Sequence, residues 1–495
     1  MLNTTIVVGS GISGLAAAIV LARHGRRVLV LERHTAAGGC MQHFRRRGPA
    51  GPLHFDVGVH YVGSMKPGQL LWRLLRYLGA TVTAVPLRED GFDRISLPGI
   101  ELDLPVGWPA LAGALKHACP GEDAAIDIHV RRMQAVEASL NWHALNPDAE
   151  GAYDRELFEL PLSAWLDSLR VSPRLRGLLC SQSSLYGVPS GRVPLAVHAP
   201  VVGSALEGPC YIRGGGAALV QGLVSRLREL GGEVRTRCAV HRALVHGEQA
   251  SGVELETGET LPAAEVILAL HPVTAAAMMP PDAWRGALQQ RMAALQEGVG
   301  LFAVYGWVEG GAGELAGRNY YLLRENDPDC YFRPSRDSAD AIVNLPPPEA
   351  GVQPFVAMGS AGFEWFAPWA ASRPMQRGAG YAELKEHLCA NVLSRIEQRL
   401  PALAGRLRVV ETASPLTLRD YVGYPRGGIY GIEPSLAAQG RNGVRRRTRY
   451  RGLYVTGAGT GTPGILGACV TGFAVAGSML GTEDLIRAVR RETDP

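Results

Sequence analysis

The sequence lacks several features that would place it in common functional classes. Of its 50 Lys and Arg residues only three are lysines (Lys66, Lys116 and Lys385), and the formal net charge is +4. The basic residues are scattered, so no basic stripe of the kind that binds nucleic acid is present. The eight cysteines form no CxxC pair, which predicts no zinc or redox-disulfide site and favours reduced thiols in a cytoplasmic protein.

The sequence also lacks an uncharged apolar run of about 18 residues, so no transmembrane helix is expected. The apolar N-terminal run follows no basic segment and is interrupted by Gly9, Gly11 and Gly14. A strand entering a nucleotide-binding turn explains it better than a signal peptide. The longest relaxed apolar stretch, Val193–Leu206, contains His198 and Pro200 and predicts a core or tunnel-lining loop.

The periodicity of the chain predicts an α/β protein with two interleaved domains, because 495 residues with 46% hydrophobic content exceed one simple core. Apolar runs predict strands and helical spacing predicts helices. The predicted strands are Thr5–Val8, Arg27–Glu32, Glu233–Val240, Ser251–Glu256, Thr260–Pro262, Glu265–Leu270, Leu301–Val308, Phe355–Gly359 and Gly452–Thr456. The predicted helices are Leu15–His24, Leu70–Gly79, Leu157–Leu169, Ala218–Leu230, Tyr381–Leu400 and Leu466–Leu480.

A G-x-G-x-x-G motif follows the first predicted strand and opens the first helix. Gly9 permits a tight turn, Gly11 lets the backbone approach a pyrophosphate, and Gly14 lets helix and strand pack closely, with Ile12 and Ser13 between the last two. Glu32 ends the next strand, where an acid binds ribose hydroxyls. A glutamate there also disfavours a bound 2′-phosphate.

Further motifs extend this pattern beyond a plain NAD domain. Glu32-Arg33 is followed by Gly38-Gly39-Cys40, and the run Asp56-Val57-Gly58-Val59-His60-Tyr61 comes soon after. Tyr211–Gly216 precedes a helix, Pro415–Tyr421 precedes Gly428, Tyr430 and Gly431, and Leu453–Gly457 leads to Pro463–Ala468. Together these blocks resemble flavoproteins related to glutathione reductase, amine oxidases and carotenoid desaturases, over nearly the whole chain.

The resemblance implies bound FAD and an α/β fold: a doubly wound FAD-binding (ββα) Rossmann-like domain with an inserted α+β substrate domain. We expect residues 1–104, 205–275 and 411–490 in the FAD-binding domain and residues 105–204 and 276–410 in the substrate domain. The expected cofactor-binding residues are Gly9, Gly11, Ile12, Ser13, Gly14, Glu32, Arg33, Gly38, Gly39, Cys40, Val59, Val240, Gly457, Gly464, Ile465 and Leu466. Val240 would meet the adenine at the end of its strand, and no metal is expected.

Within that group, the Gly-Gly-Cys and Asp-x-Gly-x-His-Tyr runs most resemble the retinol saturases, with carotenoid isomerases and phytoene desaturases close behind. Relatives tend to have Cys-Cys where this chain has Cys40-Met41, and the loop at Arg45–Pro52 carries an unusual insert. Amine oxidases usually have Glu at the position of Ala458 and a flavin-side lysine that has no obvious counterpart here. Amine oxidation is therefore disfavoured.

The resemblance implies an enzyme that saturates, desaturates or isomerises carbon–carbon double bonds of a long apolar polyene by hydride transfer with flavin N5. His60 and Tyr61, expected beside the flavin, are the candidate catalytic residues; the alternative is that they only pack there. Cys40 is either a reactive thiol or a packing residue, and Trp365, Phe366 and Trp369 line a lipid tunnel or belong to a core. The predicted helix Leu70–Gly79, with Gly79 near its C-cap, packs in the domain or dips into a membrane surface.

Two rival functions remain open from the sequence. One is a flavin oxidase of an amine or of a tailoring-pathway intermediate. The other is a non-catalytic lipid-binding protein similar to the GDP-dissociation inhibitors, which share this fold without flavin. The intact glycines of the first motif, Glu32 and the segment Gly457–Gly467 disfavour the latter. The expected partner is a lipophilic small molecule, with peripheral membrane docking compatible with such a substrate.

Overall fold

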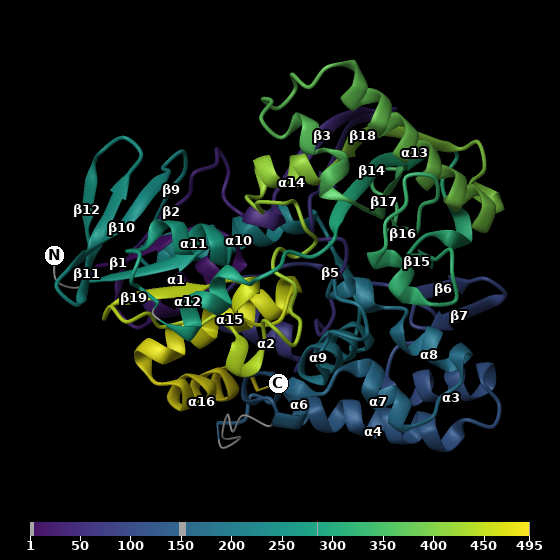
Figure 1. Cartoon of the computed structure of the whole chain (residues 1–495), viewed down its shortest axis with the longest axis horizontal. Coiled ribbons are helices and arrows are strands. Elements are labelled where there is room, and N and C mark those ends of the chain that lie inside the picture. Colours follow the sequence, from purple (N-terminus) through teal and green to yellow (C-terminus); the bar gives the residue numbers. More distant parts are fainter. Residues whose placement is uncertain (1–3, 148–154, 285, 495) are drawn as a thin grey trace.

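A computed structural model of the chain describes residues 4–147, 155–284 and 286–494. A parallel sheet lies at the left of Figure 1, a larger mixed sheet at the upper right, and a group of helices below the latter. Within the described ranges, no helix is both long enough and apolar enough to traverse a bilayer.

The first sheet is built entirely of parallel strands in the order β19-β13-β1-β2-β9. Its strands are β1 (Thr4–Val8), β2 (Arg27–Leu31), β9 (Glu233–Arg235), β13 (Glu265–Ala269) and β19 (Leu453–Thr456). One face is covered by helices and the other by the antiparallel strands β10 (Val240–His246), β11 (Gln249–Leu255) and β12 (Thr260–Pro262). The helices of that face are α1 (Ile12–Arg23), α10 (Gly215–Glu229) and α15 (Gly464–Leu480).

The alternation of side chains along β1 explains this three-layer arrangement. Successive residues of a strand point to opposite faces, and Val7 packs among the helices while Ile6 and Val8 pack among β10 and β11. All three side chains are almost completely buried. The predicted ββα Rossmann-like domain is therefore confirmed.

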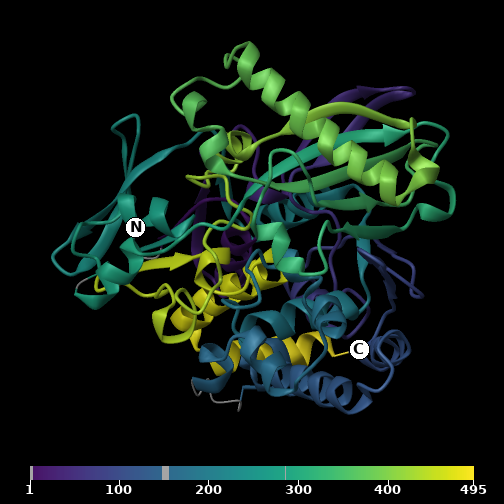
Figure 2. The same cartoon turned by 45° about the vertical axis from the view of Figure 1, so that its right-hand side comes forward.

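The second sheet has seven strands in the order β18-β14-β17-β16-β15-β6-β7. They are β6 (Asp93–Leu97), β7 (Ile100–Leu104), β14 (Gly300–Val308), β15 (Arg318–Leu322), β16 (Ala341–Leu345), β17 (Gln353–Ala361) and β18 (Leu407–Ala413). The long helix α13 (Ala379–Arg399) lies across one face of this sheet, as the turned view in Figure 2 shows.

The helices below the second sheet come from the middle of the N-terminal half. They are α3 (Trp108–Ala118), α4 (Asp123–Ser139), α5 (Asn141–Ala144), α6 (Arg155–Glu159), α7 (Leu162–Ser168), α8 (Pro173–Cys180) and α9 (Leu195–Leu206). Smaller elements complete the described fold: hairpin β3 (His43–Gly48)/β4 (Gly51–Asp56), pair β5 (Ala84–Pro86)/β8 (Cys210–Ile212), and helices α2 (Leu70–Leu78), α11 (Pro272–Met278), α12 (Ala287–Ala293), α14 (Pro415–Tyr421) and α16 (Thr482–Thr493).

Several sequence-based expectations need correction. Most of the apolar stretch Val193–Leu206 forms helix α9, from Leu195 on, rather than a loop, because nearly every residue of the helix is buried and this burial outweighs the hydrogen bond lost at Pro200. The predicted strand Glu233–Val240 is two strands, interrupted where Arg237 adopts a positive φ of 54°, so Val240 begins a strand instead of ending one. The predicted loop Arg45–Pro52 forms most of the β3–β4 hairpin.

Strand pairing also bears on the expected domain boundaries. β6 and β7 pair with β15 in the second sheet, although residues up to 104 were expected in the FAD-binding domain. β18 spans the expected boundary at residue 411 and pairs with β14. We propose that the first boundary falls between β5 and β6, and that β18 belongs wholly to the substrate domain.

Helix α2 is an internal helix of the fold. Its apolar side, including Leu71, Leu74 and Leu78, is completely buried in the core that also contains α1 and α16. Arg73 pairs with Asp494 and the Arg76 guanidinium lies over the Trp72 ring. The apolar face of α2 is therefore occupied by protein and is not presented to a membrane.

Candidate active site

A cavity of about 260 Å³ lies at the carboxyl edge of the parallel sheet, where the β1–α1 turn, the end of β2 and the start of α15 meet. In open parallel sheets, ligands bind at this edge. Segments far apart in the sequence form its wall: Val8–Ser13, Leu31–Arg33, Gly38–Gln42, Cys238–Val240, Ala269–Pro272, Tyr421–Tyr424, Gly457–Gly459 and Gly464–Ile465. We call it the cofactor cavity.

Each of the three glycines of the β1–α1 turn is suited to its position for a different structural reason. Gly9 has a φ of 101°, and an added Cβ would lie 2.5 Å from Ala269 O. At Gly14 an added Cβ would lie 2.3 Å from Gly9 O, so only glycine lets α1 approach β1. At Gly11 an added Cβ would meet no protein atom within 4 Å, so the space beside it belongs to the cavity. The unpaired N–H groups that begin α1 are suited to bind an anion there.

Glu32 organises the polar end of this wall. Its Oε2 accepts hydrogen bonds from Ser10 N at 3.1 Å and Ser10 Oγ at 2.6 Å, and its Oε1 accepts from His34 N at 2.8 Å. Ser10 Oγ in turn accepts from Gly38 N at 3.0 Å. These contacts tie the first glycine turn to the Gly38-Gly39 segment and hold the carboxylate at the cavity wall, where a carboxylate can accept from ribose hydroxyls.

The C-terminal segment closes the cavity from the other side. Ser13 Oγ lies 2.8 Å from Thr456 Oγ1 and 3.0 Å from Thr471 Oγ1, so buried hydroxyls join α1 to β19 and α15. Gly457 and Gly464 have φ values of 130° and 81°. The chain can therefore turn sharply before α15 begins, which brings the N-terminal amides of a second helix to the same cavity.

Most of the residues expected to bind the cofactor lie in this wall. They are Gly9, Gly11, Ile12, Ser13, Glu32, Arg33, Gly38, Gly39, Cys40, Val240, Gly457, Gly464 and Ile465. Three expected residues lie elsewhere. Gly14 packs under the turn, Val59 is buried in the core beside Gly216, and Leu466 lines a separate, smaller cavity. His271, Tyr424 and Tyr430 belong to the wall although the motifs did not indicate them as cofactor contacts.

A second cavity of about 160 Å³ adjoins the first and is lined by both domains. The two cavities share Cys40, Gly58, Val422, Tyr424 and Tyr430. The remaining wall is mainly apolar or aromatic: Val57, His60, Tyr61, Ser184, Leu185, Leu301, Tyr321, Tyr331, Ile342, Asn344, Met358, Leu418, Gly428 and Ile429. We call it the substrate cavity. Among the described residues, no aspartate, glutamate, lysine or arginine lines it.

The structure brings the two candidate catalytic residues together in the substrate cavity. Burial lowers the pKa of His60 to about 4, so its imidazole is neutral near pH 7. The Tyr61 hydroxyl donates to Asp93 Oδ2 at 3.0 Å and lies 3.0 Å from the Tyr321 hydroxyl. Because a carboxylate only accepts and Tyr61 has one proton, Tyr321 donates to Tyr61.

Asp93 lies behind this pair and is completely buried. Besides Tyr61, it accepts from Gln182 Nε2 at 2.8 Å and from Asn319 Nδ2 at 2.7 Å. Burial raises the pKa of Asp93 to about 6, although these donors stabilise its charged form and act in the opposite direction. The Asp93 carboxyl therefore does not line the cavity itself but is connected to it through the hydroxyl groups of the tyrosines in the wall.

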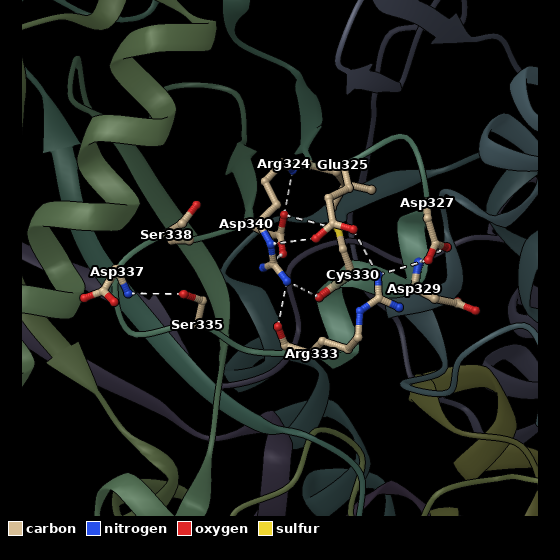
Figure 3. Close-up of polar contacts among 12 residues, drawn as sticks. Arg324, Glu325, Asp327, Asp329, Cys330, Arg333, Ser335, Asp337, Ser338 and Asp340 are labelled. Atoms are coloured by element: carbon tan, nitrogen blue, oxygen red, sulfur yellow. Dashed lines mark hydrogen bonds and ion pairs between the residues drawn. The ribbon is translucent and has the colours of Figure 1, made fainter.

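A short helical turn, η4 (Pro328–Phe332), places the Tyr331 ring in the wall. Figure 3 shows how it is held: the Arg324 guanidinium bonds Asp340 Oδ2 at 2.6 Å and reaches the carbonyl oxygens of Cys330 and Arg333 at 2.9 and 2.6 Å. Asp340 is 1% exposed, and such a buried charge pair with extra hydrogen bonds fixes a loop geometry. On the other side of η4, Asp329 accepts from Ser190 Oγ at 2.7 Å.

Cys40 lies at the junction of the two cavities, with its Sγ 3.1 Å from the Tyr424 hydroxyl. Burial is the main effect on this thiol and raises its pKa. Since the thiolate is the nucleophilic form, this direction favours the packing alternative for Cys40 over a reactive thiol. Phe366, predicted to line a lipid tunnel or to belong to a core, is a core residue. It is completely buried between the second sheet and α13, with its ring 5.9 Å from that of Tyr381.

The sequence motifs did not indicate the residues that the second sheet contributes to the substrate cavity. Tyr321 on β15 and Ile342, Asn344 and Met358 on β16 and β17 belong to one face of the second sheet. One signal was available: Asn344 is a polar residue within the otherwise apolar run of β16, and Asn319 follows Arg318 at the start of β15. Buried strands rarely contain such residues without a structural or functional reason.

Comparison with known proteins agrees with this geometry. The family described as flavin containing amine oxidoreductase matches residues 12–367. The chain is 27% identical to an all-trans-retinol 13,14-reductase of Danio rerio, over 96% of this chain and 85% of that protein. It is 24% identical to a phytoene desaturase (neurosporene-forming) of Rhodobacter capsulatus, over 94% of this chain and 92% of that protein.

Among solved structures, an oxidoreductase from Methanosarcina mazei has the same fold, with a TM-score of 0.66 and 16% identity over 95% of this chain and 99% of that one. FAD suits the cofactor cavity of this chain: two helix N-termini and the open space at Gly11 suit a pyrophosphate, and Glu32 suits a ribose. The chain belongs to the flavin containing amine oxidoreductase family and is an FAD-dependent oxidoreductase.

Proposed function

We propose that the enzyme saturates, desaturates or isomerises carbon–carbon double bonds of a long apolar polyene, such as a carotenoid or retinoid. The observation that carries the proposal is the uncharged wall of the substrate cavity. An amine substrate is a cation near pH 7, and a cation enters such a cavity only against a large desolvation cost. A neutral polyene instead gains from burial against Leu301, Ile342 and Met358.

The relatives support the same choice among the family's chemistries. Two of them are named as a retinol reductase and a phytoene desaturase. None of the three lysines lines either cavity: Lys66 pairs with Glu89, Lys116 pairs with Asp127, and Lys385 lies near Glu411. Amine oxidation is the second candidate function, but among the described residues no carboxylate lines the substrate cavity to pair with an ammonium group.

When bound, FAD supplies hydride exchange at its N5 atom. The chain's own residues provide the remaining functions. The apolar wall excludes water and orients the polyene along the shared boundary of the two cavities. Tyr61 is the proposed proton-holding group at that wall, because its hydroxyl connects the cavity to the buried carboxyl of Asp93. His60, neutral near pH 7, is proposed to contact the substrate without contributing a charge.

The cytoplasmic location and peripheral docking on a membrane belong to the same proposal. A reduced state of all eight cysteines, none of which is paired in the described structure, suits the cytoplasm. A lipophilic substrate is drawn from a membrane or a carrier, so transient membrane contact would shorten its path through water. Sedimentation with liposomes of phosphatidylcholine and phosphatidylglycerol, with and without salt, measures that contact directly.

The decisive experiment is an anaerobic flavin spectrum of the purified protein, before and after reduction with dithionite. Mixing with a panel of polyenes, retinoids and amines should give one of three responses to a polyene or retinoid. Reoxidation of the reduced flavin identifies saturation, bleaching of the oxidised flavin identifies desaturation, and a rearranged polyene with no net change in the flavin spectrum identifies isomerisation. Bleaching by an amine, with no response to any polyene, would overturn the proposal.

A further inference from the structure

One tyrosine, Tyr430, lies where the cavities of the active site meet. A third cavity of about 100 Å³ adjoins the cofactor and substrate cavities. It shares Gly464 and Ile465, at the start of α15, with the cofactor cavity. It shares Tyr61 and Leu185 with the substrate cavity. Among the described residues, Tyr430 is the only one that lines all three cavities, so its side chain is placed to contact both the cofactor and the substrate.

The backbone of Tyr430 has a conformation that a tyrosine rarely adopts. Its φ is 61°, in the left-handed region that glycine occupies readily but where the Cβ of other residues crowds the backbone. Among the described residues, no other non-glycine residue with a positive φ lines any of the three cavities. Strained residues of this kind cluster at functional sites, so the conformation indicates that a tyrosine side chain is needed at this position.

Backbone hydrogen bonds on both sides of Tyr430 maintain this conformation. Ile429 N donates to Val299 O at 2.8 Å, and Gly431 O accepts from Gly298 N at 2.9 Å. Both partners directly precede β14, so the segment that contains the tyrosine is joined to the start of a strand of the second sheet. The ring is therefore positioned by its backbone and needs no side-chain partner to hold it in place.

The hydroxyl of Tyr430 is free and opens toward the cavities. It forms no hydrogen bond with any residue that the structure describes, and it is not one of the unpartnered atoms that protein encloses on all sides. Burial raises its pKa, so it keeps its proton near pH 7 and is a hydrogen-bond donor. It interacts electrostatically with groups in the wall of the substrate cavity: the hydroxyls of Tyr61, Tyr321, Tyr331 and Tyr424 and the thiol of Cys40.

We propose that Tyr430 is a catalytic residue whose hydroxyl donates a hydrogen bond to the flavin ring of the bound FAD. The tyrosine lines the same two cavities as Gly464 and Ile465, which begin α15 and bring its N-terminal amides to the cofactor cavity. Reduction adds two electrons to a flavin, and a hydrogen-bond donor stabilises the negative charge that the ring gains. The inference rests on FAD binding and not on the identity of the substrate.

The test measures the reduction potential of bound FAD in the absence of any substrate. Tyr430→Phe keeps the ring and removes a hydroxyl that bonds to no described residue, so no known hydrogen bond within the protein is lost. Loss of a hydrogen bond to a charged group should weaken the binding of reduced FAD about tenfold to a hundredfold more than that of oxidised FAD. For a two-electron couple this change lowers the potential by about 30–60 mV, measured anaerobically by equilibration with a reference dye.

Tyr331→Phe is the matched control for this measurement. The Tyr331 hydroxyl also forms no hydrogen bond with a described residue, and Tyr331 lines the substrate cavity but not the cofactor cavity. The variant therefore removes the same chemical group from the same wall, away from the cofactor. The Tyr331→Phe protein should keep the wild-type reduction potential.

The outcomes decide the inference independently of the proposed function. A lower potential in Tyr430→Phe, with an unchanged potential in Tyr331→Phe, supports the contact with the flavin. An unchanged potential in Tyr430→Phe, or an equal shift in both variants, overturns it. Because no substrate is present, a lack of response to polyenes in the flavin spectrum would refute the proposed function without affecting this result.

Discussion

Alanine substitutions at Gly11 and Gly14 should separate cofactor binding from folding, although the two glycines are only three residues apart. At Gly14 an added Cβ would lie 2.3 Å from Gly9 O, about 1 Å closer than even a weak C–H···O contact allows. The clash is with backbone rather than a flexible side chain, so α1 must move from β1. Overpacking of this kind costs about 1–3 kcal/mol, and Gly14→Ala should lower both stability and FAD content.

At Gly11 an added Cβ would meet no protein atom within 4 Å, and the φ of −63° is open to any residue. The stability of the flavin-free protein should therefore change by less than about 1 kcal/mol, since the alanine restricts the unfolded chain but caps α1 less well. The methyl group would occupy the space expected for the pyrophosphate. Loss of one charge-assisted hydrogen bond, about 1.5–3 kcal/mol, predicts FAD affinity about tenfold to a hundredfold weaker.

The assay combines two measurements on flavin-free protein. Titration with FAD, followed by quenching of flavin fluorescence, gives the affinity, and urea unfolding without FAD gives the stability. Keeping FAD out of the unfolding experiment is essential, because a bound ligand stabilises the native state by mass action. FAD binding by Gly11→Ala with wild-type affinity would refute the placement of the pyrophosphate, and wild-type stability of Gly14→Ala would refute the packing argument.

Three further predictions follow from the contacts around the two cavities. Glu32→Ala leaves Ser10 and the His34 amide without their shared acceptor, so FAD affinity measured by the same titration should fall at least tenfold; an unchanged affinity would contradict the ribose assignment. For Asp93, the pKa of about 6 in the folded protein exceeds the ordinary value of 3.8, so the native state binds the proton more tightly than the unfolded state does. The contribution of this carboxyl to the free energy of unfolding should therefore decline as pH rises from about 4 to about 6, by at most about 3 kcal/mol. The unfolding free energy of wild type minus that of Asp93→Asn, measured across this range, should therefore decrease with pH, and an increase would show that the partners outweigh burial. Phe366→Ala should cost about 3–5 kcal/mol in chemical denaturation without altering polyene binding, because Phe366 is core; weaker polyene binding at unchanged stability would restore the tunnel hypothesis.

The sequence alone was sufficient to predict the parts of this protein that depend on local backbone geometry. A G-x-G-x-x-G turn needs glycine for reasons that operate within a few residues, so Gly9, Gly11 and Glu32 could be predicted together as cofactor-binding residues before any contact was known, and all three line one cavity. The same holds for α2 with Gly79 at its end, where a φ of 72° terminates the helix. Local predictions were wrong where two local signals conflicted, as in α9, where the apolar run prevailed over Pro200.

The tertiary structure decided everything that depends on pairing between distant strands. Asp93, Asn319 and Asn344 come from three separate segments, and only the register of β6, β15 and β16 places them side by side. A one-residue shift of any of these strands would turn its side chain to the opposite face of the sheet. No motif within a single segment encodes that register, which is why the sequence predicted the cofactor side of the active site and the fold alone revealed the polar row behind the substrate cavity.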